Sequence, residues 1–477
     1  MVKTSSLTTV GRNNKRLGSV NSMSYIFYYL TEDSGNPKER NEVNYLRLIG
    51  RVVVVTRGDT TNGNYGNDIK RLNLPSQSRL VVSAYSMWTK LCYLLCRPSN
   101  SLTDKEFPTR NVYTGNLLVR WFINHLWPVK YWKFINRLLP VYETLYFAPF
   151  KLARLFVRDK HRLGKRLKRI VVHDALILRI TRFTSYILMA RRSGMFTLAN
   201  VKSWDNPFYT QFARGASGYL TWSQSMWSDV QRFHQVSTLA CHTWGPRPFY
   251  NFAHAVRCTP YKPNTEYGTV VIGYAAAFCD PLMAAHEVKV LAGIAEHLRA
   301  SGLDLKILFR PYPIVPMSSY EPLEKYSNIE IVDIKGTPTD RYGDGREIIR
   351  FGSDEERIQY LSRCHCFLSI ATSFTFEAAL FGMPVIQYFV PKNERVNKHE
   401  SAFFGRLDIS DHILNYFLPH LSVVKSSTSI IELIKSFKTN PSMRKPPLEM
   451  MSVIGLPFKE IDWNVKAAHL VTDLHLT

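Results

Sequence analysis

The sequence is poor in features that define several classes of protein. It has only 7 cysteines in 477 residues, and Cys364 and Cys366 are separated by a single residue, which is not the spacing of a zinc site. Residues 1–22 are polar and basic, without the apolar core of a secretory signal, and predict a disordered leader. The longest apolar stretch, residues 80–96, is interrupted by Lys90 and is shorter than the ~20 residues of a spanning helix. We therefore expect a cytosolic protein with reduced, buried thiols.

Acidic residues are scarce in the first half of the chain. Residues 1–260 hold 38 Lys and Arg against 13 Asp and Glu, whereas residues 261–477 hold 23 against 25. The formal net charge of +23 therefore comes from the first half alone. Such an asymmetry predicts an acidic partner for that half, either nucleic acid or an anionic membrane surface.

The remaining composition is that of a globular protein. Apolar residues make up 45% of the chain and charged residues 21%, which is enough apolar material for a packed core. At ~100–200 residues per domain, the length predicts two or three domains.

Alternating strand and helix patterns occupy most of the first half. Runs rich in aromatic and β-branched residues predict strands at 24–30, 52–56, 169–174, 195–201, 218–222 and 237–241. Helical patterns fall between them, including 178–192 and 226–235. Strands that alternate with helices are typical of a parallel sheet.

A basic and aromatic region interrupts this pattern. Residues 110–192 carry 18 Lys and Arg against three acids, interleaved with Trp, Tyr and Phe. This mixture suits the headgroup layer of a membrane, so we predict membrane-proximal helices at 110–165, inserted into the first domain. A nucleic-acid surface and an ordinary helical subdomain are the alternatives.

The second half shows a new α/β unit. Strands are predicted at 269–273, 306–309, 329–332, 366–369 and 385–388, and Val288, Leu291, Ala295 and Leu298 have helical spacing. Ser353 and Glu356 predict a capping box at the start of a helix. We therefore expect a first domain at 23–260, a linker at 261–268 and a second domain at 269–477.

The most informative segment for function is 369–384. A strand ends in Ser369, Thr372-Ser373 follows at the predicted start of a helix, and Gly382-Met-Pro384 ends that helix. Ligands of parallel sheets bind beyond the carboxyl ends of the strands, and a helix N-terminus attracts phosphate. One turn further along, Glu377 could accept hydrogen bonds from a ribose. The alternative is an ordinary capped strand–helix unit.

Arg310 is a second candidate, because it directly follows a predicted strand in Arg310-Pro-Tyr-Pro313. A guanidinium has the fork geometry that binds phosphate. A surface arginine on a rigid turn is the alternative.

Several of these segments carry a resemblance to a known family. The element from Thr372 to Ile386 resembles the donor-nucleotide segment of GT-B glycosyltransferases. Three further segments, Ser203-Trp-Asp-Asn206, Thr221-Trp-Ser223 and His242-Thr-Trp-Gly-Pro246, resemble the end of the first domain in bacterial surface and capsular polysaccharide transferases. CDP-glycerol glycerophosphotransferase-like proteins share the outline. Their pattern has His where this chain has Tyr312, which favours sugar transfer over polyol-phosphate transfer.

The resemblance implies an α/β fold with two Rossmann-like domains whose parallel sheets face a cleft. It implies that the second domain holds a nucleotide-sugar donor and the first domain the acceptor. It assigns Arg310, Thr372 and Ser373 to the donor phosphates and Glu377 to the ribose. No cofactor and no metal are expected, because helix dipole and basic side chains can neutralise the leaving diphosphate.

The catalytic base has five candidates in the first domain. Glu32 and Asp33 follow the first strand, His173 and Asp174 follow a later one, and Asp205 lies in the loop before the strand at 218–222. An inverting mechanism needs such a base, a retaining one does not, and the sequence does not choose between them.

The sequence thus predicts a glycosyltransferase of surface polysaccharide biosynthesis with a glycan or lipid-linked acceptor. We expect it in the cytoplasm, held peripherally on the inner face of the cell membrane by its basic region, and expect no nucleic acid as partner. A polyol-phosphate transferase, a sugar-nucleotide epimerase, a basic nucleic-acid-binding protein and a non-catalytic scaffold are the rivals.

Overall fold

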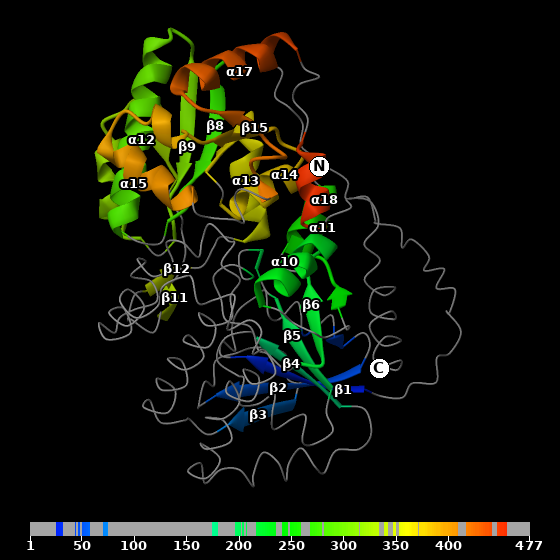
Figure 1. Ribbon diagram of the computed structural model, residues 1–477. Coiled ribbons are helices and arrows are strands. Elements are labelled where there is room, and N and C mark those ends of the chain that lie inside the picture. Colours follow the sequence, from blue (N-terminus) through cyan, green and yellow to red (C-terminus); the bar gives the residue numbers. More distant parts are fainter. Residues whose placement is uncertain are drawn as a thin grey trace, which may run out of the picture.

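The described part of the protein forms two lobes in the computed structural model, each built on one parallel β-sheet (Figure 1). The first lobe contains the described residues up to 258, and the second contains those from 268 on. The structure describes residues 25–31, 43, 46–47, 50–57, 70–74, 174–179, 196–201, 203–204, 207, 216–234, 241–246, 249–258, 268–278, 281–313, 315–332, 338–341, 347–349, 353–370, 372–408, 416–440 and 446–455.

The sheet of the first lobe has seven strands in the order β3-β2-β1-β4-β5-β6-β7, and every neighbouring pair is parallel. The strands are β1 (Tyr25–Thr31), β2 (Gly50–Arg57), β3 (Lys70–Leu74), β4 (Asp174–Arg179), β5 (Phe196–Asn200), β6 (Gly218–Thr221) and β7 (Cys241–Thr243). The order reverses at β1, which lies between β2 and β4. This reversal makes the carboxyl end of β1 the place where such a sheet offers a ligand site.

Most elements predicted for the first half are confirmed where the structure describes them. The predicted strands at 24–30, 52–56, 195–201 and 218–222 correspond to β1, β2, β5 and β6. The predicted helix at 226–235 corresponds to α10 (Gln224–His234), and a further helix, α11 (Tyr250–Cys258), ends the first lobe. The leader 1–22, the insertion 110–165 and most of the linker 261–268 lie outside the described residues.

The strand predicted at 169–174 was placed wrongly along the sequence. The strand begins at Asp174 rather than ending there, and β4 includes residues 178 and 179, which were predicted to start a helix. Asp174 pairs with Ile26, near the start of β1, so it lies at the amino end of the sheet. The cause is that Ala175–Leu178 is as apolar as residues 170–172 before His173 and Asp174, so composition alone does not decide which of the two runs forms the strand.

The sheet of the second lobe has six strands in the order β10-β9-β8-β13-β14-β15, again all parallel. The strands are β8 (Val270–Ala275), β9 (Leu305–Arg310), β10 (Ile329–Ile331), β13 (Cys366–Ser369), β14 (Val385–Tyr388) and β15 (Ser422–Val424). Numbered along the chain this order is that of the doubly wound dinucleotide-binding sheet, with its reversal between β8 and β13.

Helices cover both faces of this sheet (Figure 1). The helix α12 (Pro281–Ala300) packs against α15 (Lys398–Leu407) and α17 (Ser427–Thr439), and it buries the predicted stripe of Val288, Leu291, Ala295 and Leu298. The helices α13 (Asp354–Ser362) and α14 (Phe374–Leu380) contact α11 of the first lobe, and α18 (Leu448–Val453) packs on α14. The predicted capping box of Ser353 and Glu356 is present.

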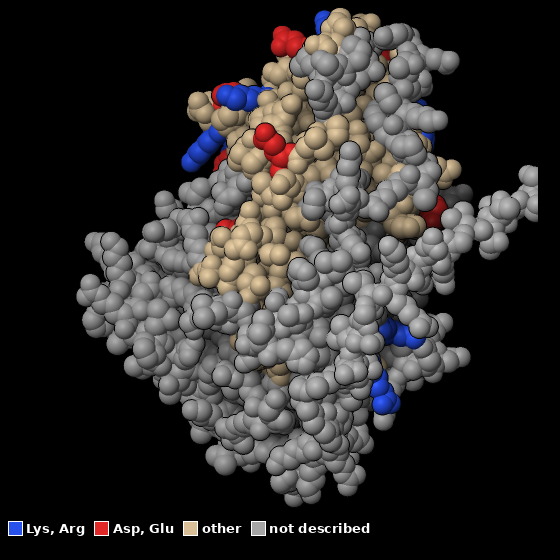
Figure 2. Space-filling view, turned by 90° about the vertical axis from the view of Figure 1, so that its right-hand side faces the viewer, with Lys and Arg blue, Asp and Glu red and all other residues tan. Residues whose placement is uncertain are grey.

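Smaller elements complete the second lobe. Short 3-10 helices lie at η6 (Met317–Ser319), η7 (Glu321–Leu323) and η8 (Lys392–Glu394). An antiparallel hairpin, β11 (Pro338–Arg341) and β12 (Glu347–Ile349), precedes α13 and was not predicted. The described charged side chains on the upper lobe are of both signs and interspersed on the face in Figure 2, as the near-neutral second half predicts.

The predicted fold class is confirmed by this topology. Two Rossmann-like parallel sheets follow one another along the chain, and both have the same reversal of strand order. No helix among the residues described is long and apolar enough to cross a membrane.

Candidate functional site

The candidate site lies where β8, β9 and β13 end, at the reversal of the second sheet. These strands end at Ala275, Arg310 and Ser369, and the backbone N–H of Ala276 donates to the carbonyl of Arg310 over 2.9 Å. The loops after β8 and β13 diverge to opposite faces of the sheet at this point. A doubly wound sheet binds its ligand there, because the diverging loops leave the strand ends accessible.

Arg310 is the last residue of β9 and is buried, with 6% of its surface exposed. Its guanidinium lies over the ring of Phe374, 4.9 Å from the ring centre. Burial lowers the pKa of Arg310, and the nearby Glu377 carboxylate opposes that effect. A guanidinium removed from water in this way interacts strongly with any anion that reaches it.

The turn after β13 presents two hydroxyl groups. The backbone N–H of Phe374 donates to the hydroxyl of Thr372 over 2.9 Å, whereas the side chain of Ser373, at the N-cap of α14, forms no capping hydrogen bond. Of the two hydroxyls expected at the start of this helix, that of Thr372 accepts from the helix backbone and that of Ser373 does not. Ser373 is exposed, and its oxygen accepts a hydrogen bond from the indole N–H of Trp204 over 3.1 Å.

This hydrogen bond joins the two lobes. Trp204 follows β5 at the carboxyl edge of the first sheet, and Ser373 follows β13 at the carboxyl edge of the second. The indole of Trp204 also packs on Phe376 and Phe417, with ring centres 5.4 Å and 4.8 Å away. On the first lobe, Phe249 packs against Phe376 at 5.9 Å. The contact therefore brings the carboxyl edges of the two sheets together.

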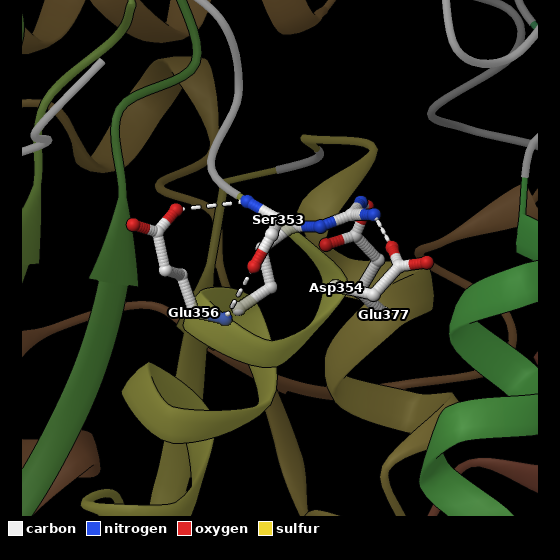
Figure 3. A network of polar contacts seen from close by, with 5 residues as sticks. Ser353, Asp354, Glu356 and Glu377 are labelled. Carbon is white, nitrogen blue, oxygen red and sulfur yellow. Dashed lines mark hydrogen bonds and ion pairs between the residues drawn. The ribbon is translucent and has the colours of Figure 1, made fainter.

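Glu377, predicted as the ribose ligand, lies in α14 with 5% of its surface exposed. One of its oxygens, Oε1, accepts a hydrogen bond from Nη1 of Arg357 on α13. Arg357 also forms an ion pair with Asp354 one turn earlier in the same helix. Figure 3 shows Asp354 and Glu377, the two partners of Arg357, together with the capping box of Ser353 and Glu356.

Arg357 was not predicted from the sequence as a residue of the candidate site. The pairing with Glu377 spans 20 residues and two elements, so no local pattern reveals it. The only signal in the sequence is the three-residue spacing from Asp354, which places both side chains on one helix face.

The base candidates of the first domain fall in different places. Glu32, Asp33, His173 and Asp205 lie outside the described residues. Glu32 directly follows the last residue of β1, where the strand order of the first sheet reverses, and Asp205 directly follows Trp204. Asp174 begins β4, at the edge of the sheet opposite to the one on which the ligand is expected.

The residues described hold no group of three or more His, Cys, Asp and Glu side chains placed to bind a metal ion.

No protein-family model and no curated protein matches the sequence. Several solved structures match the chain in fold at low sequence identity. A trehalose-6-phosphate protein from E. coli, bound with UDP-2-fluoro glucose, matches with a TM-score of 0.49 and 8% identity, over 95% of this chain and 99% of that chain. An α,α-trehalose-phosphate synthase (UDP-forming) from Burkholderia vietnamiensis matches with a TM-score of 0.48 and 9% identity, over 95% and 100%. The UDP-GlcNAc 2-epimerase from Methanocaldococcus jannaschii matches with 0.45 and 9%, over 94% and 99%. Since these TM-scores lie below 0.5, the fold assignment rests on the strand order of the two sheets.

Proposed function

We propose that the protein is a glycosyltransferase that uses a nucleotide-sugar donor. The observation that carries the proposal is the position of Arg310, Thr372 and Ser373 at the strand-order reversal of the second sheet, against the carboxyl edge of the first. A donor bound there has its nucleotide on the second lobe and its sugar toward the first.

The chemistry of this edge suits a leaving diphosphate. Arg310 supplies a buried positive charge, and the hydroxyls of Thr372 and Ser373 supply hydrogen-bond donors on the neighbouring turn. Groups that are already in place stabilise the charge that develops on the leaving oxygen without reorganising. We keep the expectation that this neutralisation needs no bound metal or cofactor.

For an inverting reaction, Glu32, Asp33 and Asp205 are the favoured bases. Glu32 and Asp33 follow the strand at which the first sheet reverses, and Asp205 follows the residue that contacts Ser373. His173 and Asp174 are disfavoured as the base. Asp174 is the first residue of β4, so these two residues come at the amino end of the strand, whereas the ligand is expected at the carboxyl end.

We further propose that the acceptor is a glycan or lipid-linked molecule of surface polysaccharide biosynthesis at the inner face of the cell membrane. The support is the excess of cations over acids in residues 1–260, of which a few near an anionic surface contribute ~1 kcal/mol each. Binding to anionic vesicles that is absent from neutral vesicles, and lost at high salt, is the expected result. Equal recovery in the supernatant with both vesicle types would refute the membrane part alone.

The donor is tested with purified full-length protein and a panel of UDP-, GDP-, CDP- and CMP-sugars. One nucleotide class should raise the melting temperature in a concentration-dependent way. Ser373→Ala and Arg310→Gln should weaken that shift, while Ser362→Ala and Arg363→Gln, on the exposed side of α13, should leave it unchanged. Mass spectrometry of the products then separates transfer, which releases a nucleotide, from epimerisation, which yields an isomeric sugar. No stabilisation by any nucleotide-sugar at millimolar concentration would refute the proposal.

A further inference from the structure

The hydroxyl of Ser373 is not used by the helix that follows it. Ser373 occupies the N-cap position of α14, but its backbone is already helical (φ −60°, ψ −22°) and its side chain forms no capping hydrogen bond. The N–H groups of Phe374, Thr375 and Phe376 donate instead to the hydroxyl of Thr372 and to the carbonyls of Thr372 and Ser373. The first turn of α14 is therefore satisfied without the Ser373 hydroxyl.

This hydroxyl instead has a partner on the other lobe. An indole N–H can only donate, so Oγ of Ser373 is the acceptor in the 3.1 Å hydrogen bond from Trp204, and Ser373 keeps its own proton. Among the residues that the structure describes, none accepts that proton, and Ser373 is exposed. An exposed hydroxyl with this arrangement suits a group that only accepts hydrogen bonds, such as a phosphate oxygen.

Packing fixes the direction of the Trp204 indole. The side chain is buried, and its ring lies against Phe376 and Phe417, both of the second lobe. Turning the indole away from Ser373 would break these ring contacts, which stabilise the protein in addition to the apolar area that they bury. The N–H of a first-lobe residue therefore stays directed at the Ser373 oxygen.

A donor at the oxygen changes what the Ser373 hydroxyl offers to a ligand. Hydrogen bonds in a chain polarise one another, so the bond from Trp204 makes the remaining proton a better donor. A hydroxyl that is already oriented also loses less freedom when the ligand binds. The buried guanidinium of Arg310, which lies over the ring of the next residue, Phe374, adds a positive charge that favours an anion at this edge of the sheet.

We propose that Trp204 is a positioning residue whose indole N–H fixes the hydroxyl of Ser373, so that the proton of this hydroxyl is held ready for a phosphate oxygen of the donor. This inference rests on the proposed function and deepens it, because it makes a residue of the first lobe part of nucleotide binding on the second. Since such coupling is reciprocal, a bound nucleotide should in turn strengthen the contact between the lobes.

The test measures dissociation constants of UDP, GDP, CDP and CMP for the full-length protein by titration calorimetry. Trp204→Phe removes the N–H and keeps an aromatic ring, so the dissociation constant of the nucleotide that binds should rise about three- to tenfold. Ser373→Ala should raise it at least as much. In the Ser373→Ala background, Trp204→Phe should have no further effect, because its only route to the ligand has been removed.

Three more proteins separate positioning from folding. Ser373→Thr keeps a hydroxyl and should retain the effect of Trp204→Phe. Replacement of Trp204 by 3-benzothienylalanine keeps the shape of the indole without its N–H, so it should weaken binding as Trp204→Phe does, even if the phenylalanine variant folds poorly. The matched control is Trp222→Phe, because this buried indole packs on Phe249 of the same lobe and its N–H has no partner among the described residues. It should bind the nucleotide as the parent protein does.

The outcomes distinguish this inference from the proposed function. Equal weakening by Trp204→Phe with and without the Ser373 hydroxyl would mean that Trp204 acts only through packing, and it would overturn the inference alone. Unchanged binding by both position-204 variants would do the same. A parent protein that binds none of the four nucleotides overturns both the inference and the proposed function.

Discussion

Glu287 should make the stability of the second lobe depend on pH near neutrality. This residue of α12 is fully buried, and its Oε1 accepts hydrogen bonds over 3.0 Å from the hydroxyl of Tyr274 and from the backbone N–H of Ala277. Burial raises the pKa of Glu287 from its ordinary value of 4.5 to about 8, and these hydrogen bonds offset only part of that effect.

The direction follows from where the proton is held. Below pH 4.5 the carboxyl is protonated in the folded and the unfolded protein alike, so its contribution to stability is fully present. As the pH rises, the unfolded chain releases the proton and the folded chain keeps it, so folding is progressively disfavoured until the folded pKa is passed. One pH unit corresponds to about 1.4 kcal/mol, and the interval from 4.5 to about 8 to roughly 5 kcal/mol.

The substitution Glu287→Gln isolates this effect. The amide oxygen can still accept from Tyr274 and Ala277, and the amide stays neutral at every pH. Between about pH 5.5 and 7.5, the variant should gain on the parent protein by about 1.4 kcal/mol per pH unit. At about 2–4 °C per kcal/mol, the calorimetric melting temperatures of the second lobe should diverge by roughly 3–6 °C per pH unit.

A control on the same helix removes the general effect of losing an acidic residue. Glu296 is exposed and accepts a hydrogen bond from the hydroxyl of Tyr326. Glu296→Gln should follow the parent protein in parallel over the whole range. If Glu287→Gln also runs parallel, the carboxyl ionises in the folded protein as readily as in water, and the reasoning from burial is refuted.

Three further substitutions test local features. Gly455→Ala should lower the free energy of unfolding by about 1–3 kcal/mol, because φ is +85° and a Cβ would lie 2.2 Å from the backbone oxygen of Trp222. As its control, Gly405→Ala, which has open space around it, should be neutral or stabilising in the same denaturant titration. Trp204→Phe removes the hydrogen bond to Ser373 and keeps an aromatic ring, so the free energy of unfolding should fall by about 1 kcal/mol in a denaturant titration. An unchanged free energy of unfolding would mean that this interlobe hydrogen bond does not stabilise the protein. Ser353→Ala removes the N-cap of α13 and should cost about 1 kcal/mol in thermal unfolding, with an unchanged melting temperature as the contrary result.

Local patterns in the sequence were sufficient to predict most of the second lobe. The strands are short β-branched runs bounded by Gly, Pro or polar residues, and α12 carries its apolar stripe at helical spacing. The turn at Gly382 was predicted as a helix end, and the structure gives this residue a φ of +88°. These features are decided within a few residues, which is why the sequence shows them.

Features that depend on distant partners were not predicted. Arg357 became a site residue only because its guanidinium reaches Glu377 on another helix, and Glu287 became a buried acid only because the backbone after β8 donates to it. In the sequence both look like ordinary charged residues of amphipathic helices. The bounds of β4 were predicted wrongly for a related reason, because they are set by the pairing of β4 with β1 and not by its own composition.

Several of the contacts between the described parts of the two lobes involve aromatic residues near the candidate site. Trp204 packs among aromatic rings of the second lobe, Tyr416 donates a hydrogen bond to Asp229 of α10, and the segment ending at Gly455 lies against the backbone of Trp222. Separating the lobes there would expose large buried aromatic side chains, among them Trp204, Phe376 and Phe417. The interlobe contact at Trp204 is therefore expected to stabilise the relative position of Ser373 and the first lobe.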